Sequence, residues 1–329
     1  MSDVFKEQRK FNRIVKKLED AEFSPKEKQK LLAWKSELYD SELSLARVNK
    51  LLNCFRLLEQ DIDFNILNPS KAELRQLVGK INRDNIRERS LSHETRRDYK
   101  KSIKKFYKYL EGDENPELID FITNGSKKGS KGVNPAELPT ANDVEKVRNA
   151  FQNDRDRAFI TLLWDTGMRP IEILNVKWKH IDHGDDLSTV YINRSKTFKR
   201  TLPFKAAQPY LMGWKNDTSK DKPEDYVFIK ETDGKQASYH TMYRQLRKAV
   251  KRADLDVPTG LKQYRKGRAT DFARRGYNVF ELMEHFGWEK PETALYYIKL
   301  AKSDVFNAYK RTQSETRHNT AQKAAIIAN

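Results

Sequence analysis

The segment TGMRPIEIL, residues 166–174, decides how the second half of the chain folds. It follows the apolar run DRDRAFITLLWD, which reads as a helix that Gly167 ends, since glycine readily takes the left-handed conformation of a helix C-cap. Pro170 suits the first turn of the next helix, because its missing amide hydrogen needs no partner there. Arg169 is therefore predicted at the amino terminus of a helix, where unpaired backbone amides favour an anion.

The residues after this segment predict a mainly helical domain with a small β-sheet. The stretch STVYINRSKTFKRTLPF, residues 188–204, alternates about a basic turn, as a β-hairpin does. Further apolar patterns at helical spacing predict helices at about residues 240–253, 262–275, 279–286 and 291–310.

The first third of the chain carries helical patterns. Residues 3–22 and 24–40 read as two charged helices, the second opened by the capping-box sequence SPKE. Between residues 43 and 112, Leu, Ile, Phe and Tyr recur three and four residues apart with basic residues between them, which predicts a small helical domain with cationic faces. The first 40 residues could bind further DNA, contact partners or cap this domain.

A change in composition separates the two halves. In residues 124–139, NGSKKGSKGVNPAELP, glycine, serine, lysine and proline replace the apolar rhythm, as in a linker. The expected organisation is an amino-terminal helical extension (1–40), a helical domain (41–123), the linker (124–139), a second, larger domain (140–312) and a carboxy-terminal tail (313–329).

The charge balance points to a polyanionic partner. The chain has 64 Lys and Arg against 47 Asp and Glu, a net charge of +17 and a pI near 9.6, and nucleic acid is the commonest polyanion that such proteins bind. The last helix of the first domain, SHETRRDYKKSIKKFYKYL, interleaves cations with aromatic residues, which favours phosphate contact. Its candidate DNA-binding residues are Arg96, Arg97, Lys100, Lys101 and Lys104.

Several other classes of site and location are excluded. The single cysteine, Cys54, lies in an apolar run and can build neither a disulfide framework nor a cysteine metal site. The six histidines show no zinc-ligand spacing, so neither a metal nor a cofactor is expected. No apolar run approaches about 18 residues and the amino terminus is not a signal peptide, which predicts a cytoplasmic protein.

Three motifs carry a resemblance to a known family. TGMRPIEIL resembles the first conserved box of the tyrosine recombinases (the lambda integrase and Xer family), usually TGLRxxEL, with Arg169 and Glu172 in the matching places. KQYRKGRAT is similar to the family's HxxRHTFAT box, and FGW stands where the family has LGH or LGW. The nucleophilic tyrosine of the family falls nine residues after that histidine or tryptophan, which selects Tyr297. The motifs occur in the family's order over residues 140–310.

The chemistry of these residues suits cleavage of a phosphodiester without a metal. Such a reaction needs a nucleophile, cations at the non-bridging oxygens and an acid for the leaving oxygen. The guanidinium groups of Arg169 and Arg265 present planar forks of donors to phosphate. The resemblance implies the catalytic residues Arg169, Lys196, Lys262, Arg265, Trp288 and Tyr297, with Glu172 supporting them from behind.

The hairpin turn RSKTFKR contains two candidates for the acid. Lys196 resembles the family's hairpin lysine, which protonates the leaving 5′ oxygen. Lys199 is its rival, because the turn is about one residue shorter than the family's common form.

Two positions depart from the family's commonest pattern. Lys262 stands where histidine is usual, and a lysine of ordinary pKa, about 10.4, is protonated at neutral pH, so the identity of the general base stays open. Trp288 replaces another histidine, and its indole can donate a hydrogen bond to a phosphate but cannot carry a proton. His285, three residues earlier, is a weaker candidate for that task.

The tyrosine pair Tyr296 and Tyr297 cannot both face a phosphate. Neighbouring residues on a helix point about 100° apart. With Tyr297 as the nucleophile, Tyr296 is predicted to be a core aromatic.

The resemblance implies a site-specific DNA recombinase, either an integrase of a virus or mobile element or a Xer-like chromosomal resolvase. It would work through a 3′-phosphotyrosyl intermediate in a prokaryotic-type host. The family's fold is a helical core-binding domain and an α+β catalytic domain that form a clamp on double-stranded DNA. The family acts as a homotetramer on specific recombination sites and exchanges carboxy-terminal segments, here expected within residues 305–329. In the catalytic domain, Lys266 and Arg268 are expected to contact phosphates.

Two other functions stay open. A type IB topoisomerase shares the phosphate chemistry and differs in the fate of the cleaved strand. A DNA-binding protein that has kept the fold but lost catalysis would share the basic surface.

Overall fold

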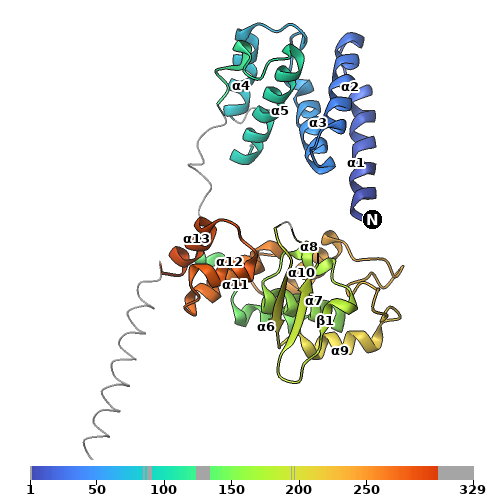
Figure 1. The fold of residues 1–329 in the computed structure, drawn as a ribbon, viewed down its shortest axis with the longest axis vertical. Coiled ribbons are helices and arrows are strands. Elements are labelled where there is room, and N and C mark those ends of the chain that lie inside the picture. Colours follow the sequence, from blue (N-terminus) through green and yellow to red (C-terminus); the bar gives the residue numbers. More distant parts are fainter. Residues whose placement is uncertain are drawn as a thin grey trace, which may run out of the picture. The chain divides into compact units, whose positions relative to one another are not determined.

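The computed structural model describes residues 2–83, 86, 91–123, 134–193, 195 and 197–302. The chain forms two compact units, Met1–Lys131 and Gly132–Asn329, each with its own hydrophobic core (Figure 1). Residues 124–133 of the expected linker, Lys196 and the expected tail 313–329 lie outside the described residues.

The first unit is helical. Its helices are α1 (Ser2–Glu19), α2 (Pro25–Asp40), α3 (Leu45–Leu58), α4 (Lys71–Asn82) and α5 (His93–Glu111), with 3-10 turns η1 (Glu59–Asp61) and η2 (Glu117–Ile119).

One core holds these five helices together. Trp34 of α2 packs its ring against Phe55 of α3 and Phe106 of α5, with ring centroids 5.8 and 5.2 Å apart. Helix α1 adds Phe11 and other apolar residues to the same core, because it packs along α3. Helices α1 and α2 therefore contribute to one core with the helices that follow them, which agrees with the capping role among those left open for this segment.

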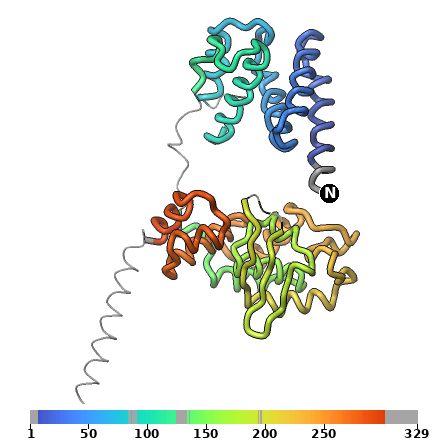
Figure 2. The backbone as a smooth tube through the Cα atoms, in the orientation of Figure 1, coloured from blue at the N-terminus to red at the C-terminus, as the bar shows by residue number. Residues whose placement is uncertain are grey.

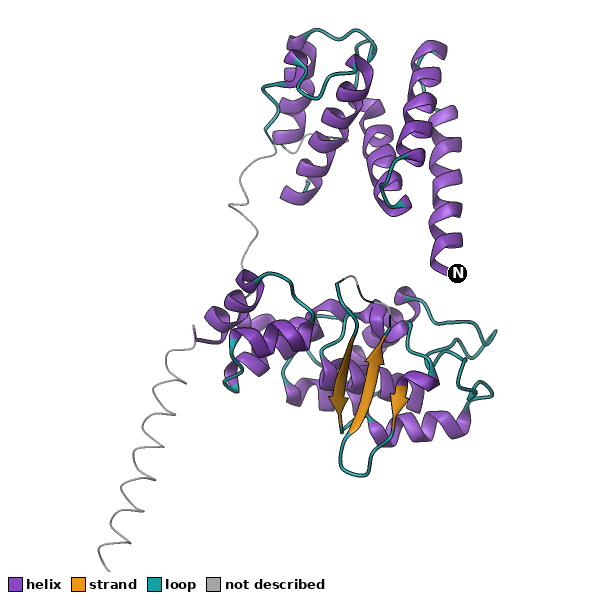
Figure 3. Cartoon of the chain, viewed as in Figure 1, coloured by secondary structure: helices purple, strands orange, loops and turns teal. Residues whose placement is uncertain are grey.

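The second unit combines helices with a three-stranded antiparallel sheet (Figure 3). The helices are α6 (Ala141–Asn149), α7 (Asp154–Thr166), α8 (Pro170–Leu174), α9 (Gln208–Asp217), α10 (Tyr239–Arg252), α11 (Leu261–Arg274), α12 (Val279–Phe286) and α13 (Pro291–Lys302). The strands are β1 (Ile181–Asp182), β2 (Ser188–Ile192) and β3 (Arg200–Phe204), and η3 (Pro135–Glu137) and η4 (Trp178–His180) are 3-10 turns.

The hairpin and the fold class predicted from the sequence are confirmed. Strands β2 and β3 pair with Val190 opposite Leu202. Their inward side chains belong to the same hydrophobic core as the apolar residues of α7. Helices α10, α11 and α12 lie within one residue of their predicted bounds. The last predicted helix is described as far as Lys302, and residues 303–310 lie outside the described part.

Two cores meet around the end of α7. The larger one is built by α6 to α10 and the sheet, and the smaller one by α11, α12 and α13, drawn in orange and red in Figure 2. Gly167 ends α7 in the left-handed conformation, with φ of +58°, and a side chain there would collide with the ring of Phe286. This close approach brings the predicted helix start at Arg169 next to the FGW turn.

Candidate active site

Arg169 anchors the site between α8 and the turn after α12. Its backbone N–H and its guanidinium each donate to the carboxylate of Glu172, both at 2.8 Å. The second amino group of the guanidinium donates to the carbonyl oxygen of Gly287 at 3.1 Å. The side chain remains 22% exposed, so part of the fork can reach a ligand.

Glu172 is the buried carboxylate on which the site converges. Besides Arg169, it accepts hydrogen bonds from the hydroxyl of Ser195 at 2.8 Å and from the guanidinium of Arg200 at 3.1 Å. Burial alone raises the pKa of Glu172, but Arg200 and these hydrogen bonds outweigh burial and leave the pKa below its ordinary value. Glu172 is therefore ionised at neutral pH and can orient the cations around it.

Arg265 of α11 is buried beside this carboxylate. Its guanidinium donates to the carbonyl oxygens of Gly167 at 2.8 Å and Phe286 at 2.6 Å, and it lies 4.0 Å from the Glu172 carboxylate. Burial, and then the charge of Arg169, lower the pKa of Arg265 to about 9. The group is still a cation at neutral pH, held rigidly by two carbonyls.

An aromatic stack connects Arg265 to the tyrosine pair. The rings of Phe286, Trp288 and Tyr297 stack in that order, with centroids 4.8 and 5.0 Å apart and planes within 16°. The Arg265 guanidinium lies 5.2 Å from the ring centre of Phe286 and 5.9 Å from that of Trp288. Burial raises the pKa of Tyr297 to about 12, although the charge of Arg265 acts in the opposite direction.

The prediction that Tyr296 is the core aromatic is wrong. Tyr296 is 38% exposed, whereas Tyr297 is 9% exposed and belongs to the core of α11, α12 and α13. The reason is that α13 turns Ala294, Tyr297 and Ala301 toward α11 and α12, at spacings of three and four residues. Tyr297, the tyrosine next to Trp288 and under the influence of the Arg265 charge, is thus also the one that packs in the core.

The hairpin turn is tied to the site on both sides of Lys196, which itself lies outside the described residues. Ser195 bonds to Glu172, and the hydroxyl of Thr197 donates to the carbonyl oxygen of Gly287 at 2.9 Å. The rival residue, Lys199, has an exposed side chain. Lys262 is also exposed, in the first turn of the helix that carries Arg265.

His285 is occupied as a structural residue. Its Nε2 lies 2.9 Å from the carbonyl oxygen of Thr166, and its ring packs edge-on against Phe272. Burial is the main cause that lowers the pKa of His285 to about 4. The imidazole is therefore neutral at pH 7 and donates to Thr166, which leaves its weaker candidacy as an acid or base without support.

The residue that sequence reasoning missed is Arg200. It is buried at the start of β3, where its guanidinium joins Glu172 to the carbonyl oxygen of His285, at 2.9 Å from the latter. The signal for it was the alternation of β3, which puts Arg200 on the same inward face as Leu202 and Phe204. A cation on the core face of a strand needs a buried carboxylate partner.

The cations of α5 divide over two faces of that helix. Arg96 and Lys100 both donate to oxygens of Asn82, and Lys100 is buried. The ammonium of Lys104 donates to the carbonyl oxygen of Ile122 while its stem lines a cavity. That cavity is also lined by Arg47, Lys101, Lys105 and Lys108. Arg97 is half-buried.

The two cations expected to contact DNA from α11 differ in their surroundings. Arg268 is paired with Asp271 at 2.8 Å and lies 4.2 Å from the ring centre of Phe272, so its charge is engaged inside the unit. Lys266 is half-buried.

Two further findings concern the described part of the chain only. Among those residues, no cluster of His, Cys, Asp and Glu has the arrangement needed to hold a metal ion. Nor does any helix there have the length and apolar character needed to cross a membrane.

The chain is similar to known recombinases. The model of the phage integrase family matches residues 138–304. The tyrosine recombinase XerA of Saccharolobus solfataricus is 26% identical over 254 residues, which cover 77% of this chain and 80% of that protein. The XerA of Pyrococcus furiosus is 27% identical over 185 residues, covering 54% and 63%.

Solved structures share the fold. The XerH recombinase bound to a palindromic difH substrate, in a post-cleavage complex, has a TM-score of 0.62 at 18% identity and covers 91% of this chain and 94% of its own. A lambda integrase dimer bound to a COC′ core site has a TM-score of 0.63 at 15% identity, covering 82% and 76%.

Proposed function

The chain belongs to the phage integrase family and is a site-specific DNA recombinase of the tyrosine type, and we propose that it works through a 3′-phosphotyrosyl intermediate formed by Tyr297. The observation that carries this proposal is that Arg169 and Arg265 both lie against Glu172, while Arg265 also lies over the ring of Trp288, on which Tyr297 stacks.

In the proposed reaction, the Tyr297 oxygen attacks the scissile phosphorus as its proton leaves. The new O–P bond forms while the bond from phosphorus to the 5′ oxygen breaks, and Lys196 gives the 5′ oxygen a proton. Arg169 and Arg265 bind the non-bridging oxygens, where negative charge grows in the transition state. Lys262 and Trp288 add a cation and an indole donor, and the acceptor of the tyrosine proton is not assigned.

The reverse of this step joins a new strand. A free 5′ hydroxyl attacks the phosphotyrosyl bond, the phosphodiester forms again, and Tyr297 is released. Because the phosphotyrosyl bond conserves the energy of the broken phosphodiester bond, rejoining needs no separate energy source.

We propose double-stranded DNA with specific recombination sites as the substrate and a homotetramer as the working assembly. In the first unit, the proposed phosphate contacts come from the cavity face of α5, with Lys101 and Lys105, while Lys108 is paired with Glu114 at 2.9 Å.

Covalent capture tests the nucleophile. A library of nicked duplexes with random sequence traps the cleaved state, because the short fragment that carries the freed 5′ hydroxyl diffuses away and leaves an adduct that resists detergent. The wild-type chain is expected to form the adduct, Tyr297→Phe to form none, and Tyr296→Phe to retain most of it. An adduct with Tyr297→Phe would show that the nucleophile is another residue.

A substrate with sulfur in place of the bridging 5′ oxygen tests the acid. A thiolate leaves without a proton, since a thiol has a pKa of about 8.5. Lys196→Ala is therefore expected to cleave the normal substrate poorly and the sulfur substrate nearly as fast as wild type does. The same pattern with Lys199→Ala, and not with Lys196→Ala, would assign the role of the acid to Lys199.

A strand-transfer assay separates a recombinase from a topoisomerase. A recombinase transfers a strand between two captured duplexes, whereas a topoisomerase relaxes any supercoiled plasmid.

A further inference from the structure

Arg200 joins three segments that surround the candidate active site. Its guanidinium donates to Glu172 of α8 at 3.1 Å, and its Nε donates to the carbonyl oxygen of His285 at the end of α12, at 2.9 Å. The same guanidinium lies 3.4 Å from the hydroxyl of Ser195 in the hairpin turn. Each of these segments carries or adjoins a proposed catalytic residue.

The contacts of Arg200 continue into the phosphate-binding arginine. Glu172 accepts from the guanidinium of Arg200 and from both the backbone N–H and the guanidinium of Arg169. His285 precedes Gly287 by two residues, and the Gly287 carbonyl accepts from Arg169 and from Thr197. Arg200 and Arg169 thus hold the same carboxylate and the same turn, one from inside the unit and one from the site.

The position of Arg200 is a costly one for a cation. It lies on the inward face of β3 beside Leu202 and Phe204, and burial lowers the pKa of its guanidinium. A buried ion pair of this kind often stabilises a fold less than apolar residues of the same volume do. A role in holding the geometry of the site accounts for this charge better than a role in stability.

We propose that Arg200 is a positioning residue for DNA cleavage, which keeps Glu172 ionised and thereby fixes the guanidinium of Arg169 and the FGW turn. The proposal rests on the proposed function for its effect on cleavage, but its effect on Glu172 can be measured without DNA. It differs from a purely structural role because it predicts a change in the ionisation of one named carboxylate.

The groups that face Glu172 come from four segments. They are Arg169 at the start of α8, Ser195 in the hairpin turn, Arg200 of β3 and Arg265 of α11. Without Arg200, burial acts on Glu172 with one strong cation fewer, so the carboxylate holds a proton to higher pH. Protonated Glu172 loses its charge-assisted hold on Arg169.

The first experiment follows the side-chain carboxyl of Glu172 by NMR in DNA-free protein with ¹³C-labelled glutamate, and Glu172→Gln identifies the signal. In wild type the signal is expected to titrate below the ordinary glutamate range, and in Arg200→Gln above it. Arg200→Lys restores a cation and is expected to return the midpoint toward that of wild type. A midpoint that does not move in Arg200→Gln would overturn the proposal.

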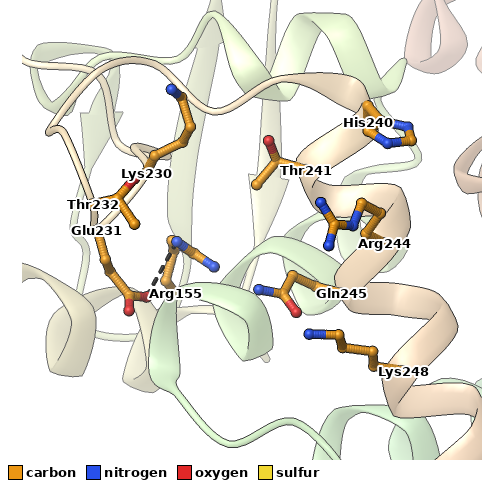
Figure 4. A pocket seen from close by; sticks show the side chains of 9 residues that line it. All are labelled: Arg155, Lys230, Glu231, Thr232, His240, Thr241, Arg244, Gln245 and Lys248. Atoms are coloured by element: carbon orange, nitrogen blue, oxygen red, sulfur yellow. Dashed lines mark ion pairs between the residues drawn. The ribbon is translucent and has the colours of Figure 1, made fainter.

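A matched control comes from another buried arginine of the same unit. Arg155 of α7 is as buried as Arg200 and is paired with Asp156 at 2.8 Å and with Glu231 at 3.1 Å, beside a cavity between α10 and the 230–232 segment (Figure 4). Arg155→Met is expected to leave the titration of Glu172 unchanged. A shift of the Glu172 midpoint in this variant would mean that any loss of a buried cation disturbs the carboxylate, and would overturn the assignment to Arg200.

The second experiment measures single-turnover adduct formation against pH on the captured duplex. Arg200→Gln is expected to cleave about 10- to 10²-fold more slowly near pH 7, in keeping with a small misplacement of a catalytic group. Its rate should fall further as the pH drops through the raised pKa of Glu172, a fall that wild type lacks. Arg200→Lys should keep the wild-type pH profile at a reduced rate, because an ammonium cannot hold Glu172 and His285 as a fork does.

The double variant Arg200→Gln, Glu172→Gln separates action through Glu172 from a direct effect. If Arg200 acts through the carboxylate, the double variant cleaves no more slowly than the worse single variant. Fully multiplicative losses would overturn that part of the proposal. If wild type formed no adduct, the proposed function would fail, and the NMR titration would still decide the role of Arg200.

Discussion

Two clusters of charged side chains in the second unit, each centred on one buried group, differ in their ratio of cations to carboxylates. Three arginines, Arg169, Arg200 and Arg265, surround the single carboxylate of Glu172. Around the single guanidinium of Arg155 lie two carboxylates, those of Asp156 and Glu231. Among the directly paired groups, the first cluster has an excess of two positive charges and the second an excess of one negative charge.

The difference separates a binding site from a structural ion pair. In the Glu172 cluster, burial and neighbouring cations lower the pKa of Arg265 to about 9, which marks a place where a further anion would relieve repulsion. In the Arg155 cluster the charge of the arginine is already compensated, and burial raises the pKa of Asp156 in spite of its partner. Arg155 is already paired with two carboxylates, whereas the three arginines around Glu172 share one, so an anion is expected to bind at the Glu172 cluster.

Exchanging one arginine in each cluster for methionine gives the largest expected contrast. Arg169→Met is expected to slow adduct formation about 10²- to 10³-fold, the usual loss for one oxyanion donor, because a phosphate ligand is gone. Its free energy of unfolding should change by about 1 kcal/mol or less, since Glu172 keeps Arg200 and Arg265. Single-turnover cleavage and denaturant unfolding measure the two quantities.

Arg155→Met is expected to behave in the reverse way. It leaves the buried Asp156 without its cation and should cost about 3 to 5 kcal/mol of stability. The folded fraction should cleave within about threefold of wild type, well inside the loss expected for a transition-state contact. Equal losses of stability in the two variants would contradict the distinction between the clusters.

Local signals in the sequence predicted the frame of the Glu172 cluster. Gly167 ends α7 and Pro170 starts α8 as expected, because the left-handed conformation and the missing amide are properties of single residues. The hairpin followed from alternation, and Arg169, Glu172 and Arg265 from the resemblance to the family's motifs. These features need only short stretches of chain to be recognised.

Features that depend on tertiary packing were not predictable from the sequence. Arg200 contacts Glu172 across 28 positions of the chain, and the alternation of β3 indicates that Arg200 is buried but does not indicate its partner. Lys100, expected at DNA, is buried because its ammonium finds Asn82 on another helix. Tyr296 was predicted in the core but Tyr297 is found there, because the face of α13 that packs depends on where α11 and α12 lie.

Alanine variants at two glycines compare a site that contacts Arg200 with one that does not. Gly287 has φ of +60°, and a Cβ there would lie 2.7 Å from a guanidinium nitrogen of Arg200. Gly276 has φ of +94°, with no atom within 4 Å of such a Cβ. Both alanine variants carry the backbone strain, about 1 to 3 kcal/mol, but only Gly287→Ala also displaces Arg200.

Gly287→Ala is therefore expected to cleave at least about 10-fold more slowly than Gly276→Ala. Single-turnover cleavage measures both rates at a temperature at which both variants are folded. Equal rates in the two variants would mean that the position of Arg200 does not control cleavage.

The protonation of His285 shows the effect of burial and of the nearby arginines on a further positive charge. Its pKa is about 4 in the folded protein, with burial as the main cause and Arg200, Arg268 and Arg265 adding to it. Between pH 4 and the unfolded value near 6.5, the unfolded chain binds a proton that the folded chain does not. Stability is therefore present above pH 6.5 and lost as the pH falls toward 4.

Wild type is expected to lose about 1 to 2 kcal/mol more than His285→Leu between pH 7 and pH 5, measured by urea unfolding at each pH. The same pH dependence in both proteins would place the proton uptake elsewhere.

An inorganic anion gives the smallest effect and tests the charge excess without DNA. Vanadate takes the five-coordinate geometry of phosphoryl transfer, and at ten times its Kd a ligand that binds only the folded state adds about 1.4 kcal/mol of stability. We expect vanadate to raise the thermal unfolding temperature of wild type and of Arg155→Met, and to leave that of Arg169→Met unchanged. Sodium chloride at equal ionic strength controls for screening, which acts on all three proteins alike. If Arg169→Met gained as much as wild type, vanadate would bind elsewhere, and the excess of cations around Glu172 would not by itself make an anion site.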